Sequence, residues 1–515
     1  MLKNNYVYMK REPIIIVIIF SVFTFLLTSV MLLKMGPLST FFTIDPDVPY
    51  LGNSLQYIVS DTIGFNTHPG TPTIILHSYA LLPLRIFTHF VIRVSFIDWV
   101  YQNIYGVFHY IRYFQSLLLA ISVGIFLISI YKSTRSILLI TFAWLALFTF
   151  SSFPHFGITI VPETLSFLFV SVWLFVFSFF QKNRSPFIFI LLSLIAGASL
   201  ANKFTNLPLV VISFMLPATL PNLNIKQKVL NSLLSVLIVI FAFIVFTWPI
   251  RQNYVGMFRW VNTLATTVGV QGSGEKTFFN IDAYTLSVKM LVSREKVPSF
   301  VVLAMFLLTL LNLAFKKDKQ ISPQLIMLLG VTITIFIFSK YYLSYYQLTN
   351  YLIVIYLLSY NLRDKNKLLT IIGVLTLIMP VVVNIKSFYS SAVRSSDKAK
   401  AIENYVYSNP SKNGTVWLWG RSKDFAIIWI RDWTGGWVFG NKLVNNNLYE
   451  LSTNLEKIST PEGSSVGLFD RCWDKLYILE SSAKIFIDKY PQYKNKYKLV
   501  SGTDDIGLIE SKCKY

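Results

Sequence analysis

Residues 14–33 read IIIVIIFSVFTFLLTSVMLL, an apolar run without a single charged side chain. A helix of about 20 apolar residues is long enough to cross the hydrocarbon core of a bilayer. Largely apolar runs recur along the chain at 14–33, 107–131, 136–154, 160–180, 186–201, 205–220, 229–249, 298–315, 322–339, 347–361 and 367–385. Since lipid cannot satisfy backbone polar groups, such runs must be helical. The sequence therefore predicts a polytopic α-helical membrane protein with about eleven transmembrane helices.

The composition excludes an ordinary soluble protein. Of 515 residues, 54% are hydrophobic and only 14% are charged, whereas an average soluble domain carries roughly 25% charged residues. The net charge of +21 could indicate nucleic acid, but the basic residues cluster between apolar runs, as they do in cytoplasmic loops of membrane proteins. We therefore expect the lipid bilayer as a partner and no nucleic acid. The run at 14–33 lacks a small-residue cleavage pattern, so we expect an uncleaved first helix.

One further apolar stretch, 72–93, decides the topology. It contains His77, Arg85 and Arg93, which are costly at membrane depth. If this stretch lies at the outer interface, all the basic clusters fall on one side, which the positive-inside rule identifies as the cytoplasm. These clusters are Lys3/Lys10/Arg11, Lys132/Arg135, Lys182/Arg184, Lys226/Lys228, Lys316/Lys317/Lys319 and Arg363/Lys365/Lys367. We therefore expect an interfacial helix, a cytoplasmic N-terminus and a multi-pass protein of the cell membrane.

This topology divides the chain into a transmembrane domain, residues 1–385, and regions that face outward. The outward regions are a first loop, 34–106, a second loop, 250–297, and a C-terminal domain, 386–515. The runs TVWLWG, SSVGLFD and KIFIDKY in the last region predict strands between helical stretches, and hence an extracytoplasmic α/β domain. Cys472 and Cys513 could form a disulfide there, because this side of the membrane is oxidising.

Two carboxylates, Asp45 and Asp47, open the first outward loop. Neighbouring carboxylates repel, which can turn one of them into a general base, and they could also coordinate a hard cation such as Mg²⁺ or Mn²⁺. Asp-Pro-Asp is equally a common turn composition, and the residue types alone favour that ordinary reading. The segment LGNSLQYI at 51–58 has a helical apolar period. We expect it to place both acids at a helix N-terminus, where carboxylates are favoured.

Three other polar residues lie at the expected outer ends of helices. His68 belongs to the rigid corner HPGTP and could either hold a ligand or cap the helix that follows. Glu163 follows Pro162 at a helix start, where an acid is unremarkable. Lys203 lies between two short apolar segments, and broken helices of this kind usually line a cavity. Its ammonium could neutralise an anionic headgroup, or it could be an ordinary snorkelling lysine.

Three arginines on the outward side could bind phosphate, for which the guanidinium is well suited. Arg251 and Arg259 lie in the second outward loop, and Arg112 stands at the outer end of its helix. The same loop contains QGSGEK, which lacks the spacing of a phosphate-binding P-loop. No Cys/His metal-ligand spacing, Ser-His-Asp elbow or dinucleotide fingerprint is present in the sequence.

Taken in order, these elements resemble the GT-C superfamily of polytopic glycosyltransferases, specifically the protein-mannosyltransferase-like family 39 and its bacterial relatives. The resemblance rests on DPDVPYL at 45–51, HPGTP at 68–72, Arg112, PETLSFLF at 162–169, ANKFTNLP at 201–208, KYYLSYYQLTNYLIVIYLL at 340–358 and WLWGRSKDF at 417–425. It covers nearly the whole chain, but no single motif is specific. The segment at 340–358 departs from the family's Arg-Tyr-Leu-Leu-Pro-like pattern, since Lys340 replaces the arginine and no proline follows Tyr342.

The resemblance implies an inverting glycosyltransferase. Its donor would be a sugar on a polyprenyl phosphate, and its acceptor a hydroxyl of a lipid, glycan or protein. The resemblance points to Asp47, three residues before Tyr50, as the base, with Asp45 as the second choice. The residues that it implies for substrate binding are Tyr50, His68, Arg112, Glu163, Lys203, Arg251 and Arg259. No cofactor is expected, and a divalent metal at the two aspartates is the less favoured alternative.

Two other functions fit a polytopic protein with outward loops. An O-antigen polymerase or ligase would depend on outward arginines and histidines and would lack an essential acid after the first helix. A transporter or flippase of lipid-linked sugars would show paired repeats and charges at the membrane midplane, and the sequence shows neither.

Overall fold

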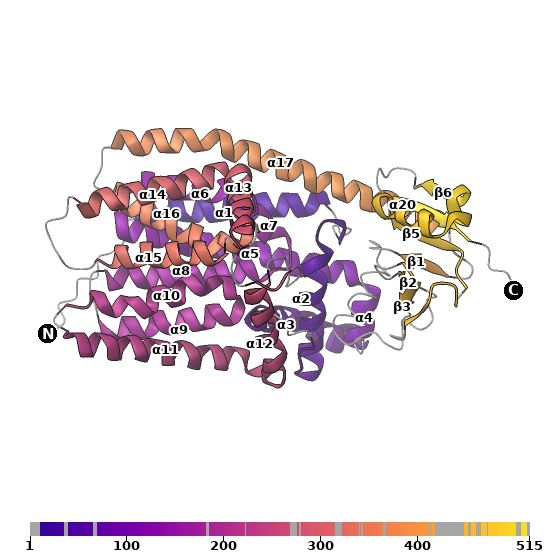
Figure 1. Ribbon diagram of the computed structural model, residues 1–515, viewed down its shortest axis with the longest axis horizontal. Coiled ribbons are helices and arrows are strands. Elements are labelled where there is room, and N and C mark those ends of the chain that lie inside the picture. The colour runs from indigo at the N-terminus through magenta and orange to yellow at the C-terminus, as the bar shows by residue number, and fades with distance from the viewer. Residues whose placement is uncertain are drawn as a thin grey trace. The chain divides into compact units, whose positions relative to one another are not determined.

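The structure is a computed structural model, and most of the chain it describes is helical (Figure 1). The described residues are 11–35, 40–64, 70–181, 185–221, 223–267, 275–277, 280–314, 322–338, 340, 343–363, 367–409, 411, 414–417, 448–451, 455–459, 465–470, 472–500 and 506–511. Contacts between Cα atoms divide the chain into two compact units. Unit 1 comprises Met1–Ser29, Asn66–Thr73 and Phe114–Phe388, and unit 2 comprises Val30–Phe65, Ile74–Tyr113 and Tyr389–Tyr515.

Each of the eleven apolar runs overlaps a helix. These helices are α1 (Arg11–Met35), α5 (Ile104–Thr134), α6 (Ile137–Thr149), α8 (Pro162–Phe180), α9 (Pro186–Asn202), α10 (Leu207–Met215), α11 (Ile225–Thr247), α14 (Lys296–Ala314), α15 (Pro323–Phe338), α16 (Leu348–Leu362) and α17 (Lys367–Ser408). Among the described residues, six helical segments have the length and composition of a membrane span, and five shorter helices are apolar. The multi-pass character follows from these segments, while the number of eleven crossings stays a prediction.

Residues 34–106, which are expected to form the first outward loop, are largely helical where the structure describes them. It contains α2 (Thr40–Ser60), α3 (Thr71–Phe87), the π-helix η1 (Thr88–Ile92) and α4 (Phe96–Gln102). The expectation that Asp45 and Asp47 begin a helix is wrong, because α2 starts at Thr40 and both acids lie inside it. The apolar residues of TFFTI at 40–44 extend the helix upstream of the acids. Segment 71–92 is one of the six span-like helices by length and composition, so its interfacial placement remains a prediction.

The described residues of 250–297, the expected second outward loop, also lie mainly in helices. It contains the 3-10 helix η4 (Trp248–Asn253), α12 (Tyr254–Thr266) and α13 (Ile281–Arg294). A single antiparallel bridge between Thr267 and Lys276 follows α12. In this structure η4 and α12 follow directly on α11.

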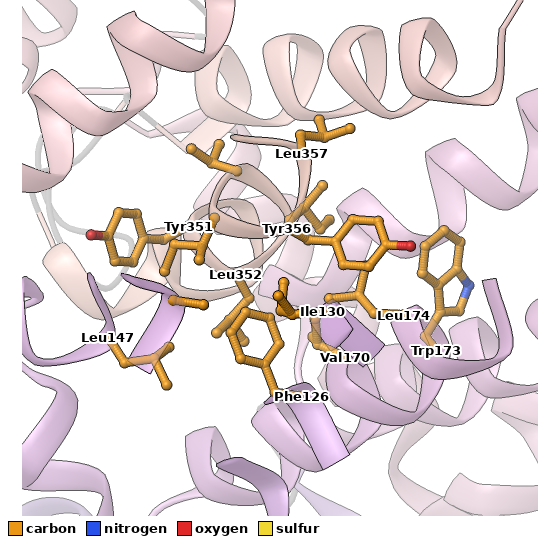
Figure 2. Close-up of a cluster of buried hydrophobic side chains, with 14 of the residues drawn as sticks. Phe126, Ile130, Leu147, Val170, Trp173, Leu174, Tyr351, Leu352, Tyr356 and Leu357 are labelled. Atoms are coloured by element: carbon orange, nitrogen blue, oxygen red, sulfur yellow. The ribbon is translucent and has the colours of Figure 1, made fainter. Parts of the chain in front are cut away.

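The core of unit 1 surrounds α16, whose side chains are buried almost throughout. A helix that is apolar on all sides is expected to be enclosed by other helices, and α16 packs against α6, α8 and α14. In Figure 2, Tyr356 of α16 points toward Trp173 of α8 within this cluster. The hydroxyl of Tyr351 makes a 2.8 Å hydrogen bond with that of Thr149, so the buried polar group is satisfied.

Helices α9, α10 and α11 lie side by side in unit 1 (Figure 1). At Gly197 of α9, a Cβ atom would collide with the backbone of Val239 in α11. A small residue at such a contact lets two helices approach closely, which is how helices associate in lipid. This packing sets the position of the C-terminal end of α9, where Lys203 follows.

The C-terminal part of unit 2 carries a small mixed sheet. Its strands are β1 (Thr415–Trp417), β2 (Leu448–Leu451), β3 (Lys457–Ser459), β4 (Ser465–Gly467), β5 (Lys475–Leu479), β6 (Tyr497–Leu499) and β7 (Ile506–Glu510). Their order is β4-β3-β2-β1-β5-β7-β6, with β1 parallel to β2 and β5 and the other pairs antiparallel. Cys472 is disulfide-bonded, while Cys513 lies outside the described residues. The domain boundary expected at 385/386 falls inside α17.

One expected strand of this domain is a helix. The run KIFIDKY belongs to α20 (Glu480–Lys489), which precedes the 3-10 helix η7 (Pro491–Lys496). Ala483 and Phe486, three positions apart, are buried, whereas Ile485 is 62% exposed. That spacing is helical rather than alternating, and the short run was too brief to separate the two periods.

Candidate functional site

In unit 2, Asp47 and Arg112 form a buried ion pair. Asp47 lies in α2 and Arg112 in α5, and each side chain is 1% exposed. The Nε atom of Arg112 donates a 2.8 Å hydrogen bond to Oδ2 of Asp47, and its Nη2 donates to the same oxygen. The guanidinium carbon also lies 5.6 Å from the ring centre of Phe108. The pairing accounts for two buried charges, which would otherwise be very costly.

The turns of α2 that follow Asp47 are enclosed. Tyr50 is buried, and Ser54 donates a 2.7 Å hydrogen bond from Oγ to the carbonyl oxygen of Tyr50. Ser78 of α3 donates from Oγ to the carbonyl oxygen of Ser54 at 2.9 Å, so α3 is tied to α2. Asp47 is thus held on a packed helix, which restricts the orientations of its carboxylate.

Two predicted site residues cannot be placed beside this pair. Asp45 belongs to α2, but its side chain lies outside the described part of the structure. His68 falls within 65–69, which the described residues do not include. Their proposed roles therefore rest on the sequence alone.

In unit 1, Glu163 and Lys203 form a second ion pair. Glu163 lies in the first turn of α8 and is 5% exposed. Lys203 follows the last residue of α9 with an extended backbone, at φ −159° and ψ 133°. Its Nζ donates a hydrogen bond to Oε1 of Glu163. The predicted break in the helix at Lys203 is therefore present, and a 3-10 turn, η2 (Phe204–Asn206), separates α9 from α10.

Two tyrosines from a distant part of the chain lie beside Lys203. Its Nζ is 4.7 Å from the ring centre of Tyr345 and 5.6 Å from that of Tyr346. Both tyrosines belong to the 3-10 helix η6 (Ser344–Gln347). Aromatic faces attract a cation, so the ammonium is held between a carboxylate and aromatic rings.

Asparagines on either side of Lys203 stabilise the break in the helix. Asn202 donates from Nδ2 to the carbonyl oxygen of Pro162 at 2.8 Å and to Oγ of Ser166 at 3.0 Å. Asn206 donates from Nδ2 to the same Ser166 Oγ at 2.9 Å and accepts at Oδ1 a 2.6 Å bond from Thr349 Oγ1. These bonds replace helical ones that the break removes, which fixes the backbone that carries Lys203.

The other predicted phosphate ligands are exposed. Arg251 donates to the carbonyl oxygen of Trp248 at 3.2 Å, and its guanidinium carbon lies 4.8 Å from the indole ring centre. Arg259 lies on the exposed surface of α12. Neither arginine is placed between a buried carboxylate and aromatic rings, as Lys203 is. Arg112, in contrast, directs two donors to Asp47 rather than toward solvent.

Two further buried charges in unit 1 were not among the predicted site residues. Glu295 is 2% exposed, and the backbone N–H and hydroxyl of Ser151 both donate to its carboxylate. Burial raises the pKa of Glu295. Lys340 is 7% exposed, and burial lowers the pKa of its ammonium. In the sequence, the only signal for Lys340 is that it replaces the arginine of the family pattern at 340–358. The sequence gives no signal for Glu295, which lies between two basic residues.

No cluster of three or more His, Cys, Asp or Glu side chains that could hold a metal ion occurs within the described residues. The side chain of Asp45 is outside them, so the alternative of a metal at Asp45 and Asp47 stays untested.

Comparison with known proteins gives a likeness of fold. No family model and no curated protein matches the sequence. Among solved structures, the chain matches ArnT from Cupriavidus metallidurans, whose crystal structure was determined with bound undecaprenyl phosphate, at a TM-score of 0.52 and 11% identity. The match covers 94% of this chain and 97% of that one. The chain has an ArnT-like membrane fold. At 11% identity this likeness is one of fold alone.

Proposed function

We propose that the protein is an inverting glycosyltransferase that moves a sugar from a polyprenyl-phosphate donor to a hydroxyl of a lipid, glycan or protein acceptor on the outer face of the cell membrane. The observation that carries this proposal is the near full-length likeness to ArnT, a protein crystallised with undecaprenyl phosphate. The family 39 resemblance of the motifs supports the same reaction. No motif match reaches the level of a family assignment.

Asp47 is the proposed general base. Its carboxylate would take the proton of the acceptor hydroxyl while the acceptor oxygen bonds to the anomeric carbon and the polyprenyl phosphate departs with the electrons of the broken bond. Inversion follows from attack opposite the leaving group. Hydrogen bonds from the planar guanidinium of Arg112 fix the direction of the Asp47 carboxylate. Because Asp47 is buried, the acceptor would reach it only after its surroundings rearrange.

Lys203 is the proposed cation for the donor phosphate. The departing phosphate gains negative charge in the transition state, so a fixed ammonium binds it more strongly than the ground state. Glu163 and the tyrosines at 345 and 346 would hold the ammonium before the donor arrives. Tyr50, His68, Arg251 and Arg259 are proposed as supporting substrate-binding residues on the strength of the resemblance.

The proposal is tested by reconstituting the purified protein in liposomes that contain a radiolabelled polyprenyl-phosphate sugar and candidate acceptors. The expected result is label that becomes covalently attached to an acceptor, with release of polyprenyl phosphate. Movement of the intact donor across the bilayer without cleavage of the sugar–phosphate bond would overturn the proposal and favour a flippase. Transfer of a preassembled glycan, with no transfer of a single sugar from its polyprenyl phosphate, would favour a polymerase or ligase.

A further inference from the structure

Lys340 is a buried cation with an unusual set of partners. It follows α15, and its Nζ donates to the carbonyl oxygen of Ala265 at 2.8 Å and to those of Leu264 and Thr277 at 3.4 and 3.5 Å. Leu264 and Ala265 lie in the last turn of α12, whose carbonyl groups lack partners within the helix. A cation at this end also complements the helix dipole. Lys340 therefore caps α12 from a distant part of the chain.

A second contact ties the same residue to α13. Ser287 of α13 is buried, and its Oγ donates to the carbonyl oxygen of Lys340 at 3.4 Å. The side chain of Lys340 thus holds the end of α12, and its backbone accepts from α13. Both helices belong to the segment 248–294, which connects α11 to α14.

The far end of this segment is held by the other buried charge. Glu295 directly follows α13, and it accepts hydrogen bonds from the backbone N–H and hydroxyl of Ser151, between α6 and α7 (Phe153–Ile158). The neighbouring Ser152 forms a 2.8 Å hydrogen bond with Ser344. Ser344 is the first residue of η6, the turn that carries Tyr345 and Tyr346.

These contacts lead by short steps to Lys203. Lys340 lies five positions before Tyr345 in the sequence, and the Tyr345 ring faces the Lys203 ammonium at 4.7 Å. Burying a charge is costly without hydrogen bonds, and the carbonyl groups at the end of α12 and of Thr277 supply them to Lys340. The buried ammonium of Lys340 therefore serves to hold α12 in place.

We propose that Lys340 is a positioning residue that fixes α12 and α13 on the bundle and, through η6, sets the place of Lys203. The proposal rests on the function proposed above, in which Lys203 receives the donor phosphate. Lys340 itself touches no substrate in this account. Its removal would loosen α12 and let Tyr345 and Tyr346 shift, so that the Lys203 ammonium is no longer held where the charge develops.

The test compares three variants of the full-length protein in lipid nanodiscs. Lys340→Met removes the charge and keeps a long side chain, and Lys340→Arg keeps a cation. Lys289→Met makes the first change at an exposed lysine of α13 and serves as the matched control. Hydrogen–deuterium exchange is followed in peptides covering 254–266 and 199–207, and transfer of the labelled sugar gives kcat and KM for the donor.

Lys340→Met should raise exchange about tenfold or more in both peptides. Peptide 254–266 loses the cap on α12, and peptide 199–207 loses the fixed positions of the Tyr345 and Tyr346 rings beside Lys203. It should lower kcat about tenfold while KM changes little, since a small misplacement of a catalytic cation slows the chemical step. Lys340→Arg should restore both measurements to near the wild-type values, and Lys289→Met should leave them unchanged.

Three results would overturn the proposal. Exchange at 254–266 that stays at the wild-type level would show that Lys340 does not hold α12. Raised exchange at 254–266 with none at 199–207 would show that the effect does not reach Lys203, and so would an unchanged kcat. If the wild-type protein transfers no sugar from any donor, the proposed function fails, whereas the two exchange measurements still decide the structural role of Lys340.

Discussion

Arg112 donates two hydrogen bonds to one carboxylate oxygen of Asp47, although the residues lie 65 positions apart in the sequence. Both side chains are buried, so the loss of either partner leaves an uncompensated charge. Removing one member of a buried pair costs about 3–5 kcal/mol, whereas replacing both members together can be nearly neutral. The pair therefore fixes the proposed base on α2 and links that helix to α5.

Arg112→Met should lower the thermal stability of the purified protein more than the double variant Asp47→Asn/Arg112→Met does. The single change leaves the Asp47 carboxylate buried without its cation, and the double change removes both charges. The measurement is the melting temperature in detergent, with Arg251→Met at an exposed site as the control. A loss in the double variant equal to the sum of the losses in Arg112→Met and Asp47→Asn would show that the ion pair contributes no coupling energy.

The Lys203–Glu163 pair makes a prediction about the donor. Lys203→Met should reduce transfer by on the order of 10²-fold, since one fixed donor to developing charge is worth that much. Glu163→Gln keeps a hydrogen-bond acceptor but removes the negative charge, so it should cause a smaller loss. Initial rates at saturating donor decide this. A larger loss in Glu163→Gln than in Lys203→Met would instead identify Glu163 as the group that acts directly.

Glu295 makes the stability depend on pH. Burial raises its pKa above the ordinary value of 4.5, so the folded state binds the proton more tightly than the unfolded state. The contribution of Glu295 to the free energy of unfolding is fully present below pH 4.5 and is lost as pH rises through the raised pKa. Glu295→Gln should raise the melting temperature at pH 8 relative to wild type and flatten its fall between pH 5 and 8.

The exposed Glu275 provides the control for that experiment. Glu275→Gln should leave the pH dependence as in the wild type. If Glu295→Gln shows the same fall between pH 5 and 8 as the wild type, another group causes it. A lower melting temperature for Glu295→Gln at pH 8 would mean that the bonds from Ser151 outweigh the cost of burying the charge.

The topology has a separate test. Because 72–93 is expected to lie at the outer interface, reporter proteins fused after residue 95 and after residue 400 should both report an outward location. Phosphatase and fluorescent-protein fusions give opposite signals on the two sides and check each other. A cytoplasmic signal at residue 95 would show that 72–93 spans. The outward placement of Arg112, Glu163 and Lys203, which follow this segment in the chain, would then have to be revised.

The positions of the long helices follow from the amino-acid sequence. Apolar runs such as 107–131 and 229–249 are long and uniform, and in lipid such runs have hardly any alternative to a helix. The start of α2 and the helix α20 were misjudged, because in short segments local composition does not separate a turn, a strand and a helix.

The candidate site was predictable only in part. The break at Lys203 and the helix start at Glu163 leave local signals in the sequence, since Pro162 and the Asn-Lys-Phe-Thr-Asn segment interrupt apolar runs. The pairs Asp47–Arg112 and Glu295–Ser151 join residues 65 and 144 positions apart. Such contacts depend on how helices pack, which periodicity in a single sequence does not specify. The carbonyl partners of Lys340 were hidden for the same reason.

The most direct test of the account is the transfer activity of Asp47→Asn, measured with a labelled polyprenyl-phosphate sugar and compared with Asp61→Asn. Asp61 is an exposed residue just after the same helix, with a backbone φ of 56° that asparagine tolerates well. Asp47→Asn should lose about 10²- to 10⁴-fold in rate, as expected for a general base, while Asp61→Asn should keep the wild-type rate. Transfer by Asp47→Asn at the wild-type rate would contradict the assignment of Asp47 as the base.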